Sequence, residues 1–262
     1  MLAQRSHRGL ALSKYKPYPP GRTRCPPPLV IAQRWLHRLW TRHNPDESLT
    51  DAAQDAIIKT LSQPRMSKYL EATGGDTARA LDLYISNNVV STALFGDLHY
   101  TEVVLRNRFN EQLTTAYGDQ WFTAAPLLKL IGKRSRDILS KAQHHAGGYT
   151  VPPGKVVAEL TFGFWVNLTD PNLEHTLWIP VLHKAFLPNT PPKRADLNRD
   201  LEKLRQLRNR VAHHEPIFMM DLIFLHHLLC EVTKRLCPDT AHWMMTNSST
   251  RAEIERLMRK LD

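Results

Sequence analysis

The sequence contains little cysteine, and its three cysteines form no close pair. Cys25, Cys230 and Cys237 are widely spaced, and none belongs to a CxxC motif. Any pairing of three thiols leaves one over, so the pattern excludes a disulfide scaffold. We therefore expect the chain to work in a reducing compartment, the cytoplasm.

Long apolar runs are also missing. No segment approaches the roughly 20 apolar residues that a membrane-spanning helix needs. The stretch "LVIA" at 29–32 is too short for the core of a signal peptide and lies too far from the start. Alternating strand patterns and internal repeats are absent as well. We expect no membrane partner, and helical periodicity is the pattern that remains.

Acidic residues are missing from one end of the chain. The first 45 residues hold nine Lys or Arg and no Asp or Glu, so the net charge of +10 is concentrated there. Two interpretations of this Pro-rich arm, residues 1–47, stay open. It is either a disordered leader or a basic arm that attracts nucleic acid or an anionic surface.

The fold class follows from apolar residues at helical spacing after Ser48. "SLTD" is a capping start for a helix that continues to Leu61, Pro64 opens a second helix, and Asp76 caps a long one that ends near Tyr117. Further helices are expected over residues 126–145, 155–168, 171–187, 194–214, 217–236 and 249–261. We predict one all-α domain over residues 48–262, a helical bundle preceded by the arm.

The helix expected over 194–214 carries cations where an apolar stripe should be. Leucines and a valine recur on one face, and Arg208 falls within that stripe. A buried arginine needs an acceptor. Asn209 and His213 lie on the far side, and His213 is about 140° from Arg208 around the helix. The two side chains meet at one ligand only if the helix frays before Pro216 or a second copy completes the site.

Two explanations of these cations stay open. Arg and His in a last helical turn are ordinary partners of the helix dipole. Alternatively, an imidazolium beside an arginine suits a phosphodiester. Glu102 lies on the edge of an apolar helix face, where it either meets a buried arginine such as Arg208 or pairs locally with Arg106.

The motif itself resembles that of a known superfamily. Arg208-Asn209-x-x-x-His213 matches the R-[ND]-x-x-x-H signature of the HEPN ribonucleases, and "LRNRVAHHEPIF" is very like the Abi-like (abortive-infection) branch. Three further parts resemble that branch. They are "GGD…ALxLYxxN" with "LxxxExxLRN", "FWVNL…LWIPVLHKAF" and "CPDTAHWM". The resemblance covers the chain from about Ser48 to Leu261.

The resemblance implies a HEPN-like all-α homodimer whose two motifs face each other across a groove. It implies a metal-independent endoribonuclease of phage defence, or a toxin, that acts on RNA without a cofactor. An antitoxin or a regulatory non-coding RNA would restrain it. The motif roles fall on Arg208, Asn209 and His213, and the accessory positions on Glu102, Arg106 and Asn107. Some relatives carry a modifiable Tyr two residues after the motif histidine, where this chain has Glu215.

Metal-free cleavage of RNA needs a base, an acid and a cation. An imidazole is able to act as base or acid near neutral pH, which makes His213 a candidate for either role. Arg208 offers a phosphate two parallel N–H donors. Asn209 would orient the histidine or a phosphate oxygen. His214 is a candidate for the second acid–base group, and Arg210 for RNA binding. The expected products carry a 2′,3′-cyclic phosphate and a 5′-hydroxyl, from single-stranded RNA.

Other classes of protein remain as alternatives. A non-catalytic RNA-binding protein would use Arg208, Arg210 and Arg106 to bind phosphates and sequester a partner RNA. A metal site would have to use the histidine doublets His144-His145, His213-His214 and His226-His227, but neighbouring helical residues point about 100° apart. We expect no metal, and we expect His226 or His227 to pack or to face solvent. The aromatic residues of 162–186 are expected in the core or at a dimer interface.

Overall fold

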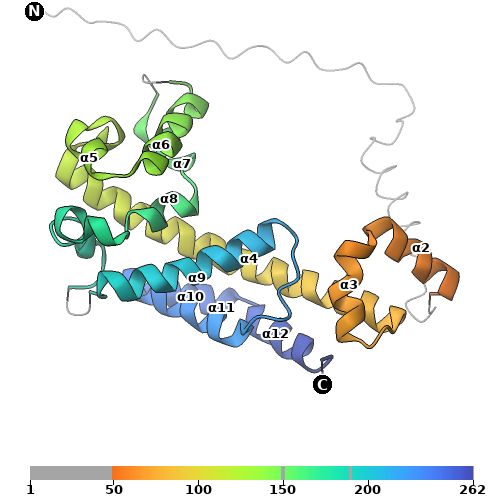
Figure 1. The fold of residues 1–262 in the computed structure, drawn as a ribbon. Coiled ribbons are helices and arrows are strands. Elements are labelled where there is room, and N and C mark those ends of the chain that lie inside the picture. Colours follow the sequence, from red (N-terminus) through yellow and green to blue (C-terminus); the bar gives the residue numbers. More distant parts are fainter. Residues whose placement is uncertain (1–48, 149–150, 189–190, 262) are drawn as a thin grey trace, which may run out of the picture. The chain divides into compact units, whose positions relative to one another are not determined.

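The computed structural model describes residues 49–148, 151–188 and 191–261 (Figure 1). The predicted arm, residues 1–47, lies outside them. The described residues form helices and turns with no strand, so the all-α prediction is confirmed for this part of the chain. None of the described helices is long and apolar enough to cross a membrane.

The first three helices of the described residues begin close to their predicted starts. Helix α2 (Asp51–Leu61) is capped by Thr50, whose Oγ1 accepts a hydrogen bond from the Ala53 N–H at 3.3 Å. Helix α3 (Gln63–Ala72) has Pro64 in its first turn. Helix α4 (Thr77–Tyr117) begins at Asp76, whose Oδ1 accepts from the Arg79 N–H at 2.9 Å. The caps of α2 and α4 therefore satisfy backbone donors that a helix leaves free, and Pro64 removes one from the start of α3.

Helix α4 is the longest element and organises the others. It has 41 residues, and it contacts α3, α9, α10 and α12. Figure 1 shows α9 and α10 running along it. Its buried face includes Leu94, Leu98 and Leu105, which join a single hydrophobic core. Polar residues placed along α4 are therefore brought next to several other helices.

Two predicted helices are each divided in the structure. The segment 126–145 forms α5 (Ala125–Leu130) and α6 (Lys133–Ala146), and 155–168 forms α7 (Pro153–Ala158) and α8 (Phe162–Asn167). Extended residues at Gly132 and Thr161 interrupt the α-helical hydrogen bonds. The second break lets α8 contact both α4 and α9, and the first lets α5 contact the 3₁₀ turn η1 (Trp121–Thr123).

The predicted helix over 171–187 is wrong. The segment forms 3₁₀ turns at Pro171–Leu173 (η2) and Leu182–Ala185 (η4), with a π turn at Glu174–Trp178 (η3) between them. Pro180 lies in the middle, and a proline removes a helical donor and clashes with the preceding turn. The core prediction for the nearby aromatic residues is confirmed, since these are all buried: Phe162, Phe164, Trp165, Trp178 and Phe186.

Four more helices follow within the described residues. They are α9 (Arg194–Ala212), α10 (Leu222–Leu236), α11 (Pro238–Asn247) and α12 (Thr250–Met258). Helix α10 starts later than predicted because Asp221 caps it, accepting from the Phe224 N–H at 3.0 Å. Helix α11 was not predicted, although Pro238 occupies the first helical position that proline favours.

Candidate functional site

The last turn of α9 ends in an ordered cap and does not fray. His213 is the C-cap, and its N–H donates to the Asn209 carbonyl at 3.0 Å. The His214 N–H donates to the Val211 carbonyl at 3.1 Å, and the Glu215 N–H to the Arg210 carbonyl at 2.8 Å. This pair of bonds is a Schellman motif. The predicted end of the helix at residue 214 is thus corrected to Ala212.

His214 occupies the position that glycine usually takes in this motif. Its φ is +55°, in the left-handed region that few side chains tolerate. Two neighbouring helices hold the turn in place. From α3, Arg65 Nη1 donates to the His214 carbonyl at 2.6 Å. From α4, the buried Asn87 Oδ1 accepts from the Ile217 N–H at 2.8 Å and the Phe218 N–H at 3.1 Å.

Arg208 lies on the inner side of α9, as its place in the apolar stripe predicts. The residue is half-buried, and its Nε is buried without a hydrogen-bond partner among the described residues. Glu102 of α4 is a carboxyl group that interacts electrostatically with Arg208. Burial raises the pKa of Glu102, while the charge of Arg208 is the largest influence that lowers it. An unpaired guanidinium donor therefore lies close to a carboxyl group that holds its proton more tightly than usual.

Within the described residues, Glu102 forms an ion pair with neither Arg106 nor Arg208, and the charge of Arg208 lowers its pKa more than that of Arg106. No ion pair joins Glu102 to Arg106 within the described ranges, and Arg106 Nε donates to Asn107 Oδ1 at 3.3 Å. The charges of Arg106 and His99 lower the pKa of Glu102 less than Arg208 does. The structure thus gathers Glu102, Arg106 and Arg208, with Asn107 exposed at the edge.

The other half of the motif faces away from this group. Asn209 and His213 are exposed, and no hydrogen bond or ion pair links His213 to Arg208 in the part of the chain described. Arg210 is engaged by the turn itself, since its Nη1 donates to the Pro216 carbonyl at 3.2 Å and its Nε lies 3.9 Å from Glu215. Within one chain, Arg208 and His213 do not converge.

A cavity lies against the last turn of α9 and was not predicted. It has a volume of about 370 Å³ and is lined by α3, α4, Val211, Ala212 and His214. Tyr69 contributes to it, and the hydroxyl of Tyr69 is buried without a hydrogen-bond partner among the described residues. Burial raises the pKa of Tyr69 to about 12.

A second polar cluster lies further along α4, and sequence reasoning missed it. Buried Asp97 accepts hydrogen bonds from Ser248 Oγ at 2.7 Å and Thr250 Oγ1 at 2.6 Å, and His226 Nε2 lies 3.4 Å away. Burial would raise the pKa of Asp97, but these hydrogen bonds outweigh it and lower the pKa. The bond to Asp97, followed by one to Cys230, raises the pKa of His226 to about 9. His226 is therefore an imidazolium at neutral pH.

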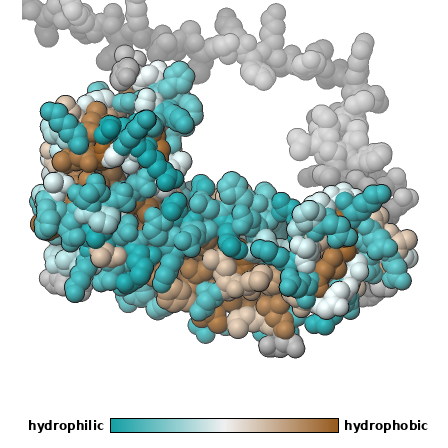
Figure 2. Space-filling view, viewed as in Figure 1, coloured by the Kyte–Doolittle hydropathy of each residue, from teal (hydrophilic) through white to brown (hydrophobic). Residues whose placement is uncertain are grey.

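A signal for this cluster was present in the sequence. Asp97 lies on the buried face of α4 next to Leu94 and Leu98. A helical wheel therefore places this charged residue within an apolar stripe, as it does for Arg208. His226 also lines a cavity of about 580 Å³ with Cys230. Figure 2 shows hydrophobic side chains at the surface over α10 to α12, where Ile223, Phe224 and Met245 are exposed. Among the described residues, no group of three or more metal-ligating side chains is placed to hold an ion.

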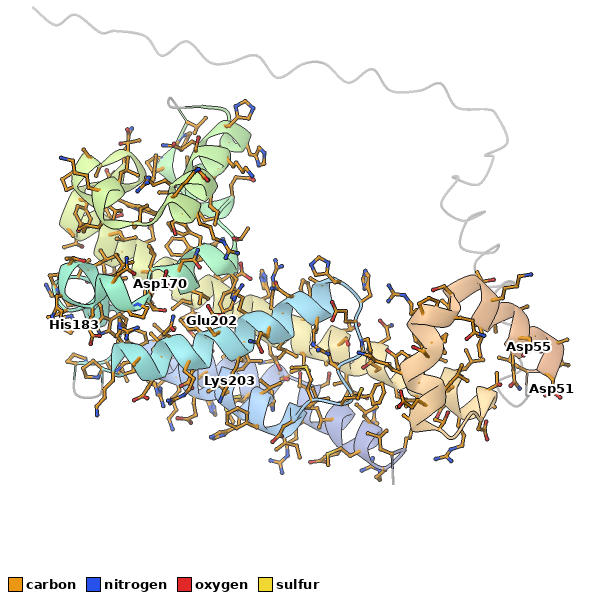
Figure 3. All side chains as sticks on the ribbon, in the orientation of Figure 1. Asp51, Asp55, Asp170, His183, Glu202 and Lys203 are labelled. Carbon is orange, nitrogen blue, oxygen red and sulfur yellow. The ribbon has the colours of Figure 1, made fainter. Side chains whose placement is uncertain are left out.

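A third group of charges lies at the start of α9. Glu202 of α9 is close to Asp170, and Figure 3 labels both residues. Burial and the nearby charge of Glu202 raise the pKa of Asp170, while Arg194 lowers it less. Arg194 is 7% exposed and satisfied, because its Nε donates to Glu174 at 2.9 Å and its Nη1 to the Thr169 carbonyl at 2.8 Å.

Comparison of the chain with protein-family models, curated proteins and solved structures gives no match. The Abi-like HEPN resemblance therefore stays a prediction from the motif residues.

Proposed function

We propose that the protein is a metal-independent endoribonuclease of the Abi-like HEPN type. The observation that carries the proposal is the buried Nε of Arg208, which has no hydrogen-bond partner in the described part of the chain. A guanidinium donor out of water costs free energy unless an acceptor meets it. Phosphate is an acceptor whose geometry the planar guanidinium matches, as it matches a carboxylate.

Arg194 on the same helix provides the internal comparison. It is more deeply buried than Arg208, yet the chain supplies acceptors from Glu174 and Thr169. The fold is therefore able to satisfy a buried arginine when that arginine has a structural role. In the proposal, an acceptor from a ligand supplies the partner that Arg208 Nε lacks.

In the proposed reaction the 2′-hydroxyl of RNA attacks the adjacent phosphorus, and the bond to the 5′-oxygen breaks. A base takes the 2′-proton, and an acid protonates the leaving 5′-oxygen. Arg208 binds the phosphate and stabilises the additional negative charge of the phosphorane. Glu102 suits the role of acid because its pKa is raised by burial, and His213 suits that of base.

His213 needs a second copy of the chain to reach the same phosphate. It is exposed, and α9 carries it on the side away from Arg208. In a two-fold dimer with facing motifs, His213 of one copy approaches Arg208 of the other. The proposed active form is accordingly a homodimer. The proposed biological role is abortive infection or toxicity, restrained by an antitoxin or a regulatory RNA. This part of the proposal rests on the family resemblance alone.

The test is cleavage of single-stranded RNA by the purified full chain in the presence of a chelator. Arg208→Ala and His213→Ala should each lower the rate on the order of 10²–10⁴-fold. His227→Ala, another exposed histidine of a doublet, is the matched control and should cleave normally. Products ending in a 3′-hydroxyl and 5′-phosphate, or loss of activity in chelator, would contradict the proposal.

A mixture of the two inactive variants tests the composite site. If Arg208 and His213 act across two copies, a mixed dimer contains one site with both residues intact. Mixing Arg208→Ala with His213→Ala should then restore part of the activity. If activity does not recover although the subunits exchange, then either both residues act within one chain or the active form is not a dimer.

The separation of His213 from Arg208 favours a second candidate function, RNA binding without cleavage. Arg208, Arg210 and Arg106 would then bind phosphates of a sequestered RNA. In this case His213→Ala leaves growth arrest in expressing cells unchanged, whereas Arg208→Ala weakens it. Sequencing of RNA ends from the same cells separates the two functions, because only the nuclease creates new ends.

A further inference from the structure

One tryptophan within the described residues is left in solvent. Trp121, Trp165 and Trp178 are at most 4% exposed, whereas Trp243 of α11 is 51% exposed. A tryptophan ring carries more apolar surface than most side chains, so the fold leaves unused a large area whose burial would be stabilising. Trp243 is also separate from the cavity of about 580 Å³, because Met245 of the same helix lines that cavity and Trp243 does not. Its exposed surface is therefore available to a partner.

Trp243 belongs to a row of three rings on the surface of α4 and α11. Its ring packs edge to face on Tyr100 of α4, with the two centroids 5.0 Å apart and the ring planes at 73°. Tyr100 packs in the same manner on His99, at 5.7 Å and 64°. His99 is exposed and Tyr100 is half-buried. This aromatic row (His99, Tyr100 and Trp243) is thus held in place by its own packing, while the rings at its two ends stay open to solvent.

The aromatic row ends next to the group that contains Arg208. Burial raises the pKa of Glu102, and the charges of Arg208, Arg106 and His99 each lower it, so all three side chains lie near one carboxyl group. Around α4, His99 lies about 60° from Glu102 and about 100° from Tyr100, on the way from one to the other. A helix with its side chains is about 10–12 Å across. The path from Arg208 to the far end of the row therefore crosses one helix, which a few nucleotides of a strand span at about 3.4 Å or more each.

The charges along this path suit a polyanion. Arg208 keeps a buried Nε without a hydrogen-bond partner in the described part of the chain. Arg106 forms no ion pair there either, and its Nε donates to the Asn107 amide oxygen at 3.3 Å. The two arginines outnumber Glu102, so the path keeps positive charge for phosphates. Aromatic rings next to unpaired cations are typical of surfaces that bind single strands, whereas the core of an interface between protein chains is depleted of charged residues.

We propose that the aromatic row binds the bases of a single-stranded RNA whose phosphate lies at Arg208, with Trp243 as the stacking platform. Stacking uses the π face that every base has, so this surface accepts any sequence but needs unpaired bases. The phosphate at Arg208 rests on the proposed function, and the aromatic row is the part of the same site that holds the strand beyond that phosphate. Trp243 binds the substrate and takes no part in the bond-breaking step.

The first experiment measures binding of the full chain to a labelled, unstructured oligonucleotide with 2′-O-methyl riboses. Such a strand lacks the attacking 2′-hydroxyl and stays intact. Trp243→Ala should weaken binding roughly 5- to 150-fold, the effect of losing one stacked base. Trp243→Phe keeps a ring and should restore most of the affinity. Met245→Ala is the matched control and should bind normally, because Met245 is 57% exposed on the same helix and lies outside the aromatic row.

The fluorescence of Trp243 reports the stacking directly. Addition of the same oligonucleotide should quench part of the tryptophan emission of the wild type, because a base stacks on the indole ring. The quenched part should be missing from Trp243→Phe. A duplex of the same sequence should leave the emission unchanged, since its bases are already paired and stacked on one another. Equal quenching of wild type and Trp243→Phe, or equal quenching by strand and duplex, would contradict the proposal.

The rival occupant of this surface is a second copy of the chain. Sedimentation of the free protein distinguishes the two, because removal of a ring from a dimer contact lowers the molar mass. If Trp243→Ala converts a dimer into monomers, Trp243 is a dimer contact and the proposal is overturned. A molar mass equal to that of the wild type, together with the loss of RNA affinity, supports the proposal.

The stacking surface and the nuclease fail separately. Cleavage of natural RNA by the wild type, with unchanged affinity in Trp243→Ala, overturns the stacking surface and leaves the nuclease in place. Affinity that depends on Trp243, with no cleavage of natural RNA, refutes the nuclease and leaves the stacking surface to the RNA-binding candidate. Absence of any binding of the oligonucleotide by the wild type overturns the stacking surface, whatever the cleavage assay shows.

Discussion

Two carboxylates on α4, Asp97 and Glu102, are five residues apart and have opposite environments. Asp97 is buried, accepts from Ser248 and Thr250 and pairs with His226, so its pKa is lowered. Glu102 is half-buried, faces Arg208 without an ion pair, and has a raised pKa. The satisfied cluster is a structural device. Glu102, whose pKa stays raised despite the charge of Arg208 and a backbone hydrogen bond from Phe162, has the properties of an acid–base group, as in sites where neighbouring pKa values are pushed apart.

The largest effect expected from this comparison is a loss in the free energy of unfolding when Asp97 is replaced. Asp97→Ala removes the counter-charge of His226 and the acceptor of two hydroxyls, and breaking a buried ion pair costs about 3–5 kcal/mol. Urea unfolding measures the loss. Asp82→Ala is the control on the same helix, because Asp82 forms an exposed pair with Lys260 at 2.7 Å, worth about 1 kcal/mol or less. Equal losses for both variants would contradict a special role for Asp97.

The second prediction concerns pH. The pKa of His226 is about 9 in the folded chain against 6.5 as its ordinary value. Because the folded state holds this proton more tightly, its contribution to stability is complete below pH 6.5 and is lost as the pH rises through 9. The loss is on the order of 3 kcal/mol in wild type and should be missing in His226→Gln. Parallel stability curves for the two proteins between pH 6 and 10 would show that the pair does not form.

Glu102 should affect catalysis more than stability. Glu102→Gln should lower RNA cleavage on the order of 10²-fold, as the removal of an acid–base group does. It should also shift one limb of the pH–rate profile. Its folded-state pKa is raised, so ionising Glu102 weakens the fold as the pH rises above the ordinary glutamate value, and Glu102→Gln should raise stability at pH 7. Glu111→Gln, at the exposed partner of Arg108, is the control. A stability loss without a change in the pH–rate profile would make Glu102 structural.

The smallest effect on stability is expected at His214, in the turn that ends α9. His214→Gly should raise stability by up to about 1 kcal/mol, because glycine has no steric cost in the left-handed region. The same change at His213, whose φ is −98°, should bring no gain. Thermal unfolding of the two variants distinguishes them. A destabilised His214→Gly would mean that the side chain contributes more than the backbone strain costs.

The sequence predicted the site to the extent that helical periodicity carried the information. The stripe on α9 identified Arg208 as a cation on a buried face, and the edge position of Glu102 left open whether it meets Arg208 or pairs with Arg106. The same reasoning applied to α4 would have found Asp97. It would not have found His226, since the doublets His213-His214 and His226-His227 look alike in sequence. One is an exposed cap, and the other contributes an imidazolium to the core.

Local chemistry in the sequence determined the all-α class, the caps at Thr50 and Asp76, and the burial of one side of α9. These features depend on neighbours within a few residues. Tertiary packing alone decided the contact of Arg65 with the His214 carbonyl, the cavity against α9 and the pairing of Asp97 with His226. Each of these depends on contacts between segments distant in the chain, and periodicity contains no information about such contacts.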